Sequence, residues 1–237
     1  MATLYLLPNW FFIYSVIFEL IFALITGFVA FYAFRVYLLS KQKESKLFSV
    51  GFTFISASYI LWAIVNLSLI DKIGDGISSV ELGNIISLGM IGVYTHIFLF
   101  IIGLLTVAYT NLKVNNAKVY SLLALLTILA LFMTDSKGSA YYVLATIFFG
   151  YIAATHLTSY IKNRNSKALI ILIAFALLFV SHIYFVFAAR SYIYYVIGHS
   201  VSLAGYALIL FGLILIIKNE QKKKSPRSNK RYSSSHK

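Results

Sequence analysis

The stretch Ser191–Lys218, SYIYYVIGHSVSLAGYALILFGLILIIK, decides the fold class of this chain. It is longer than the ~20 apolar residues that a membrane-spanning helix needs. Polar side chains recur in it at steps of three or four, which places them on one helix face. They are Tyr192, Tyr195, His199, Ser202 and Tyr206. An ionisable histidine at membrane depth faces other helices rather than lipid, so the stretch predicts a helix packed within a membrane bundle.

The composition agrees with a membrane protein. Hydrophobic residues make up 60% of the 237 positions, and the mean hydropathy is +0.86. A soluble domain carries more charge than this chain does. There is no cysteine, which excludes disulfides, thiolate metal ligands, iron–sulfur clusters and cysteine nucleophiles.

Seven apolar runs predict an all-α, polytopic membrane protein, a seven-transmembrane helix bundle formed by residues 1–218. The fourth run is short and consists mostly of Leu, Ala and Ile, which predicts a peripheral, lipid-facing helix. Residues 219–237 are basic and rich in serine, which predicts a disordered cytoplasmic tail. The predicted spans are residues 10–39, 46–70, 79–110, 118–133, 139–161, 167–189 and 191–218.

The positive charge predicts orientation rather than nucleic-acid binding. The net charge is +13, but seventeen of the twenty Lys and Arg residues fall in the loops on one side and in the tail. Because cytoplasmic loops carry an excess of Lys and Arg, the N-terminus is predicted outside and the C-terminus inside. The chain is therefore expected in the cell membrane as a multi-pass protein, with its basic tail against anionic lipid.

Four ionisable residues lie inside the predicted spans: Glu19, His96, His182 and His199. His182 and His199 are each about eight residues from the turn at Arg190, so both lie ~12 Å below the outer surface. Glu19 reaches roughly the same depth from the first span, and His96 lies deeper, ~18 Å down. Neighbouring antiparallel helices place His182 and His199 side by side. His156 lies near the inner face and is expected to be separate.

This cluster has several interpretations. Imidazole and carboxylate suit a transition metal, with Glu19, His182 and His199 as ligands. Haem b held by His96, His182 and His199 is a second possibility. A proton-responsive group is a third, because a carboxylate beside histidines changes how they titrate. In the fourth, each polar group only bonds a neighbouring helix and fixes the bundle geometry. The sequence has no HxxxH pair on a single helix, the spacing that would favour the metal interpretation over the others.

Three known seven-helix classes do not fit the sequence. A retinal protein needs a lysine midway along the last helix, whereas Lys218 lies at its end. Sugar transporters built from two three-helix repeats have prolines within their helices, but Pro8 and Pro226 lie outside the predicted spans. Zinc amidases of the ceramidase kind need two histidines on one helix. The sequence therefore points away from an enzyme.

Two segments carry a resemblance to known proteins. LPNWFFIYSVIFELIFALITGFVAFYAFRVY, which begins at Leu7, and YVIGHSVSLAGYALIL, which begins at Tyr195, resemble uncharacterised archaeal seven-helix membrane proteins. They are also similar to the membrane sensor modules of prokaryotic signalling proteins. The resemblance implies no known reaction, and this chain has no signalling domain after the bundle, so a sensor role requires a protein partner. A small transporter or channel with a polar pathway, and a purely structural bundle, remain the alternatives.

Overall fold

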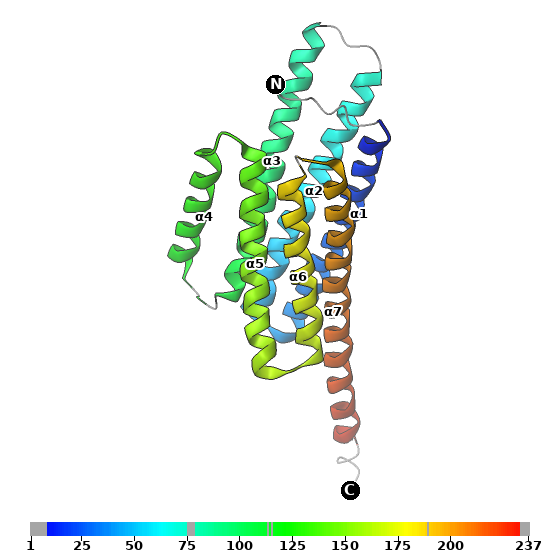
Figure 1. The fold of residues 1–237 in the computed structure, drawn as a ribbon. Coiled ribbons are helices and arrows are strands. Elements are labelled where there is room, and N and C mark those ends of the chain that lie inside the picture. Colours follow the sequence, from blue (N-terminus) through cyan, green and yellow to red (C-terminus); the bar gives the residue numbers. More distant parts are fainter. Residues whose placement is uncertain (1–8, 75–78, 113, 115, 189, 233–237) are drawn as a thin grey trace.

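The computed structural model describes residues 9–74, 79–112, 114, 116–188 and 190–232, and this part of the chain is all-helical, without strands (Figure 1). The predicted all-α fold with seven helices is confirmed, and the helix ends differ from the predicted spans by a few residues except at the C-terminal end. The helices are α1 (Asn9–Ser40), α2 (Lys43–Gly74), α3 (Ser79–Asn111), α4 (Ala117–Phe132), α5 (Lys137–Asn163), α6 (Ser166–Phe187) and α7 (Tyr192–Tyr232). Residues 1–8 of the predicted domain lie outside the described residues.

Six of these helices are long and apolar enough to cross a membrane, which is compatible with an integral membrane protein. The exception among the described helices is α4, which has 16 residues. At 1.5 Å per residue it is about 24 Å long, less than the ~30 Å of a hydrocarbon core. It contacts only α3 and α5 and leaves Leu122, Leu125 and Leu129 exposed. The prediction of a peripheral fourth helix is confirmed.

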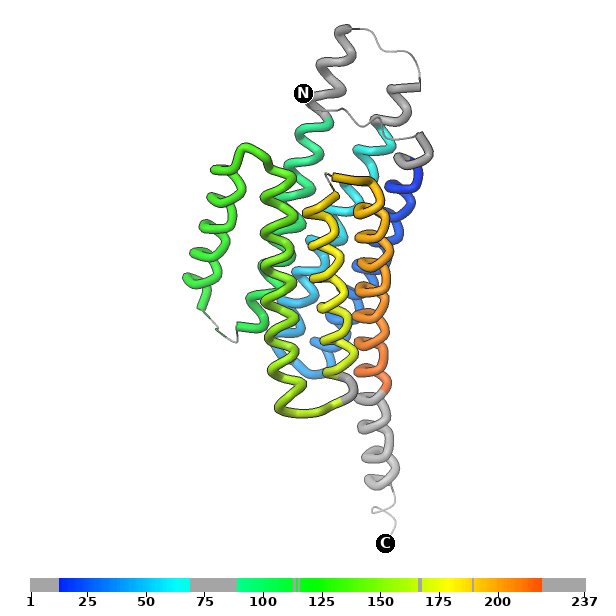
Figure 2. The backbone as a smooth tube through the Cα atoms, viewed as in Figure 1, coloured from blue at the N-terminus to red at the C-terminus, as the bar shows by residue number. Residues whose placement is uncertain are grey.

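The other six helices form two layers of three, with α1, α2 and α3 behind and α5, α6 and α7 in front (Figure 1). The layers meet where α1 packs on α7 and α3 packs on α5. α1 and α5 run in the same direction, because α4 brings the chain back along the edge of the bundle from the end of α3 to the start of α5, as the tube in Figure 2 shows. We call the end at which α6 joins α7 the cavity end, and the end at which α1 joins α2 the opposite end.

Small and hydroxylated residues let neighbouring helices approach closely, as is usual in membranes. Ser56 and Ser49 of α2 donate hydrogen bonds of 2.8 Å to the carbonyl oxygens of Ala23 and Ala30 in α1. Gly51 of α2 and Gly103 of α3 pack backbone to backbone: a Cβ added to Gly103 would lie 2.6 Å from the Gly51 carbonyl oxygen. Lipid tails are as apolar as the helix surfaces, so the hydrophobic effect does not drive helices together within a membrane. Close packing and hydrogen bonds of this kind hold α1, α2 and α3 together instead.

The last helix is longer than predicted. α7 continues past Lys218 to Tyr232 and so includes residues 219–232 of the predicted tail, while residues 233–237 lie outside the described residues. A helix that has already formed adds residues without the cost of a new nucleus. The added residues include Glu, Gln and several Lys, which are good helix formers. The direction of the chain across the membrane stays a prediction of its charge distribution.

Candidate functional site

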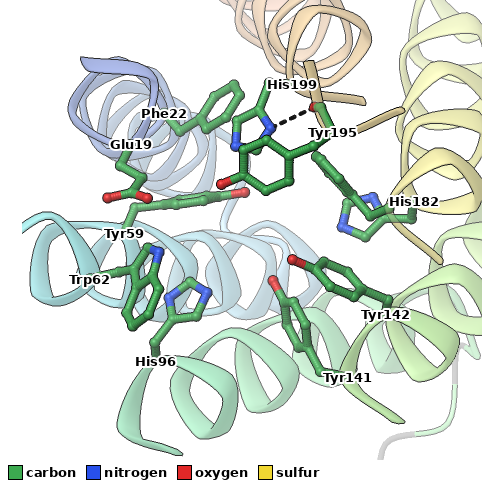
Figure 3. Close-up of a pocket in the computed structure, with 11 residues that line it drawn as sticks. Glu19, Phe22, Tyr59, Trp62, His96, Tyr141, Tyr142, His182, Tyr195 and His199 are labelled. Atoms are coloured by element: carbon green, nitrogen blue, oxygen red, sulfur yellow. Dashed lines mark hydrogen bonds between the residues drawn. The ribbon is translucent and has the colours of Figure 1, made fainter. Parts of the chain in front are cut away.

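A small cavity of about 40 Å³ lies between the two layers near the cavity end. All four residues predicted from the sequence, Glu19, His96, His182 and His199, line it (Figure 3). Six helices contribute to its wall, so residues far apart in the sequence meet here. The remaining lining residues are Phe22, Tyr59, Trp62, Tyr141, Tyr142, Phe185 and Tyr195.

The Glu19 carboxylate is held by neutral hydrogen-bond donors. The Asn66 side-chain amide donates to both of its oxygens, at 3.0 Å and 2.9 Å, and the Ser15 hydroxyl donates to Oε1 at 2.9 Å. Glu19 is 1% exposed. No Lys or Arg lines the cavity, so these hydrogen bonds, and any cation that enters, are what can balance a negative charge there.

Ser15 extends this network to the last helix. Its hydroxyl lies 2.9 Å from the hydroxyl of Tyr195. Ser15 has a single hydroxyl hydrogen and donates it to Glu19, so Tyr195 must be the donor to Ser15. The resulting chain, Tyr195 to Ser15 to Glu19, joins α7 to α1. Each donor in such a chain polarises the next, which strengthens the bond to the carboxylate.

The three cavity histidines are oriented by the same kind of hydrogen bond, from Nδ1 to a backbone carbonyl oxygen. Nδ1 of His182 lies 2.9 Å from the Leu178 carbonyl oxygen, and Nδ1 of His199 lies 2.9 Å from the Tyr195 carbonyl oxygen. Nδ1 of His96 lies 3.0 Å from the Ser58 carbonyl oxygen. A carbonyl oxygen only accepts, so each Nδ1 carries a hydrogen. In the neutral ring Nε2 then has no hydrogen and is the basic atom.

Among the described residues, no hydrogen bond to these three Nε2 atoms is found, and no buried side-chain nitrogen or oxygen lacks a partner. The Nε2 atoms are therefore accessible from the cavity rather than sealed in the protein. A ring oriented by a carbonyl at Nδ1 and open at Nε2 is ready to accept a proton or to bind a metal ion.

The histidines are separated from one another by aromatic rings. The Phe185 ring packs against both His182 and His199, with centroids at 5.4 Å and 4.9 Å. His96 stacks on Trp62 at 5.3 Å. The predicted pair of level imidazoles therefore lines one cavity, but Phe185 contacts both rings. The aromatic contacts fix the ring planes and leave a narrow space between them.

The geometry of the cavity bears on the metal and haem interpretations. In the part of the chain that the structure describes, no three His, Asp or Glu side chains are grouped so that they could hold a metal ion. The cavity also falls far short of the ~300 Å³ at which pockets for small organic ligands begin. The residues therefore do not fit haem b. The space suits a few water molecules, since one water needs about 10–15 Å³.

His156 lies apart from this site, as predicted from its position near the other end of its helix. It does not line the cavity. Its ring stacks on Phe175 with centroids at 5.2 Å and an interplanar angle of 7°. It is the natural control for the cavity histidines, because it is another intramembrane imidazole in the same protein.

Part of the cavity wall was not predictable from the sequence. Tyr141 and Tyr142 lie in the second turn of α5, where tyrosines are typical of the membrane interface, yet both line the cavity. Phe22, Trp62 and Phe185 are ordinary apolar residues by sequence. One usable signal was the spacing of Glu19 and Phe22, which places Phe22 on the face of α1 that carries Glu19.

Comparisons with protein families, with curated proteins and with solved structures find no match to this chain.

Proposed function

We propose that this membrane protein binds a proton at Glu19, in a hydrated cavity within the membrane, and responds to protonation. The observation that carries the proposal is the environment of the carboxylate. Glu19 is buried, is held by Asn66 and Ser15, and faces a cavity without Lys or Arg. A charged side chain at membrane depth costs about 3 kcal/mol or more, so ionisable residues there are rare and usually belong to functional sites. The hydrogen bonds that Asn66 and Ser15 donate to Glu19 offset part of this cost.

The chemistry of the wall favours a proton over other ligands. Three imidazole Nε2 atoms open to the cavity accept protons, and the phenol groups of Tyr59, Tyr141 and Tyr142 donate and accept hydrogen bonds. A few waters in the cavity can connect these groups to Glu19. A proton needs no fixed coordination geometry, so it is compatible with histidines that aromatic rings hold apart.

Protonation has a direct structural consequence in this proposal. A neutral Glu19 has an O–H group that donates, and it accepts the hydrogen bonds from Asn66 and Ser15 more weakly than the charged carboxylate does. The link through Ser15 to Tyr195 of α7 is then weakened. A change at the carboxyl group is passed to the packing of α1 on α7, which a partner protein can detect. This supports the sensor or partner-subunit role that the resemblance implies.

Isotope-edited infrared spectroscopy tests the proposal. With ¹³C-glutamate in the purified protein, we expect a protonated carboxyl band that appears on acidification and belongs to a buried group. The band should be absent in Glu19→Gln, and a shifted band should be found in Glu19→Asp when that variant is labelled with ¹³C-aspartate instead. His156→Ala should leave it unchanged. Identical titrations of the wild type and a folded Glu19→Gln variant would refute the proposal, and a stoichiometric metal in elemental analysis would favour metal binding instead.

A further inference from the structure

The hairpin of α1 and α2 and the hairpin of α5 and α6 are built alike. α1 ends at Ser40 and α5 ends at Asn163, which are 123 positions apart; α2 begins at Lys43 and α6 begins at Ser166, again 123 apart. The same interval separates the two turns. The connection length and the helix ends at the turn are the same in the two hairpins, whereas the helices differ in length, with 32 residues in α1 and in α2, 27 in α5 and 22 in α6.

The turn geometry is repeated at this interval. Lys41 and Arg164 are the non-glycine residues with positive φ in the described part of the chain, at 58° and 45°. Each donates its backbone N–H to the carbonyl oxygen of a tyrosine four residues earlier, Tyr37 or Tyr160, at 2.7 Å. A left-handed residue that closes a helix in this way is a specific C-cap. Its recurrence at positions 41 and 164 indicates a structural repeat.

Inside the helices, residues 123 positions apart also make the same hydrogen bond. Ser58 donates its hydroxyl to the Ile55 carbonyl oxygen at 2.8 Å, and Ser181 donates to the Leu178 carbonyl oxygen at 2.7 Å. All four residues are 0% exposed. The equivalent positions therefore have the same role in α2 and α6 as well as the same spacing.

The third helices dock on these hairpins in equivalent ways. A Cβ on Gly103 of α3 would meet the Gly51 carbonyl oxygen and the Ile55 side chain. A Cβ on Gly205 of α7 would meet the carbonyl oxygen of Ala174 and the side chain of Leu178, the residues 123 positions after Gly51 and Ile55. The chain thus contains two three-helix units, α1–α3 and α5–α7. They run in the same direction because α4, at the edge of the bundle, leads the chain from the end of α3 back to the level at which α1 begins (Figure 1).

The cavity lies at the contact between the units and contains equivalent residues from both. Three pairs of lining residues are 123 positions apart: Glu19 with Tyr142, Tyr59 with His182, and Trp62 with Phe185. In transporters with parallel repeats, the binding site lies at the repeat interface and the units move against each other. Here, the site has diverged, with a carboxyl group in one unit where the other has a phenol.

Two side-chain hydrogen bonds join the units in the described part of the chain. Ser15 bonds Tyr195 at 2.9 Å, and Tyr59 bonds Tyr206 at 3.3 Å. Tyr195 and Tyr206 are about 16 Å apart along α7. The first bond lies nearer the cavity end. The second lies toward the opposite end, where Phe22 and Phe52 also pack on Tyr206 at 5.7 Å and 6.5 Å.

We propose that the two three-helix units rock against each other and carry protons across the membrane through the cavity between them. Breaking the Ser15–Tyr195 bond opens the cavity toward the cavity end, and breaking the Tyr59–Tyr206 bond opens it toward the opposite end. The Glu19 carboxylate forms an O–H bond with a proton from water on one side and releases that proton to water on the other, with no change of oxidation state. The inference rests on the proposed proton site.

The groups that face Glu19 across the cavity contribute to its pH dependence. No Lys or Arg is among the lining residues. The titratable groups are Tyr59 of α2, His96 of α3, Tyr141 and Tyr142 of α5, His182 of α6, and Tyr195 and His199 of α7.

Proton flux into liposomes tests the activity. Liposomes containing the full chain and a pH-sensitive dye should acidify inside when a potassium diffusion potential is imposed. Glu19→Gln should reduce the flux to that of protein-free liposomes, and Glu19→Asp should restore part of it. His156→Ala should match the wild type. A Glu19 infrared band without flux above protein-free liposomes would overturn the transport inference and leave the proton site standing, whereas absence of the band would overturn the proposed function itself.

Spin-label distances test the motion independently of flux. The chain has no cysteine, so equivalent exposed positions can be labelled in pairs: Leu20→Cys with Val143→Cys near the cavity end, and Leu38→Cys with Ile161→Cys at the opposite end. We expect the two distances to change in opposite directions on acidification. In Glu19→Gln, neither distance should change with pH. Two distances that are the same in acidic and alkaline buffer would contradict the rocking of the units.

Discussion

Replacing Asn66 with leucine is expected to destabilise the bundle by about 3 kcal/mol, because the buried carboxylate of Glu19 loses its main donor. Asn66 donates to both carboxylate oxygens, at 3.0 Å and 2.9 Å. Removing one partner of a buried polar pair leaves the other unsatisfied, whereas replacing both partners with apolar groups is close to neutral. The Glu19→Leu, Asn66→Leu double variant should therefore recover most of the loss.

Thermal and denaturant unfolding in detergent would measure this double-mutant cycle. Ser68→Ala is the matched control on α2, because Ser68 only donates to the Ile64 carbonyl oxygen of its own helix at 2.9 Å. It should leave stability nearly unchanged. If the costs of the two single variants simply add in the double variant, Asn66 and Glu19 do not form one buried unit, and the account of the carboxylate is wrong.

Replacing Gly103 with valine is expected to cost about 3 kcal/mol or more, the upper part of the range for overpacking. Its added Cβ would lie 2.6 Å from the Gly51 carbonyl oxygen, which is backbone and cannot rotate away. Gly205→Val should behave similarly, since its Cβ would lie 2.8 Å from Leu178 and 3.1 Å from the Ala174 carbonyl oxygen. The parallel loss would reflect the equivalent docking of α3 and α7.

Gly138→Ala is the control for these substitutions. Gly138 lies in the first turn of α5, and a Cβ there would meet nothing within 4 Å. Alanine favours a helix over glycine by up to about 1 kcal/mol, so this variant should be neutral or stabilised. A well-folded Gly103→Val protein with wild-type thermal stability would show that α2 and α3 do not pack as closely as described.

The helices were predictable because apolar runs report membrane-spanning helices directly. The seven runs gave seven helices, and the short fourth run gave α4, which packs at the edge of the bundle. The end of α7 was not predictable from hydropathy. Beyond Lys218 the sequence is basic, and composition alone does not distinguish a solvated helix from a disordered segment.

The site was predictable in part because depth can be counted along a helix. Glu19, His182 and His199 were expected at one level, and they line one cavity. Their separation by Phe185 was not predictable, since the rotation of one helix about its axis depends on packing with others. Tyr142 was missed because tyrosines near a span end usually mark the interface. The repeat was missed because few equivalent residues are identical, among them Tyr37 with Tyr160 and Ser58 with Ser181.

The most direct test of the proton site is the ¹⁵N NMR spectrum of the five histidines in wild type and in Glu19→Gln. We predict that in alkaline buffer His96, His182 and His199 all carry their hydrogen on Nδ1, with Nε2 unprotonated. Glu19→Gln should shift the Nε2 signals and the titration of His199 and His182, because sites in one cavity titrate as a coupled group, while His156 should be unaffected. Hydrogens on Nε2 of the cavity histidines, or titrations that are the same with and without the Glu19 carboxyl group, would contradict the account.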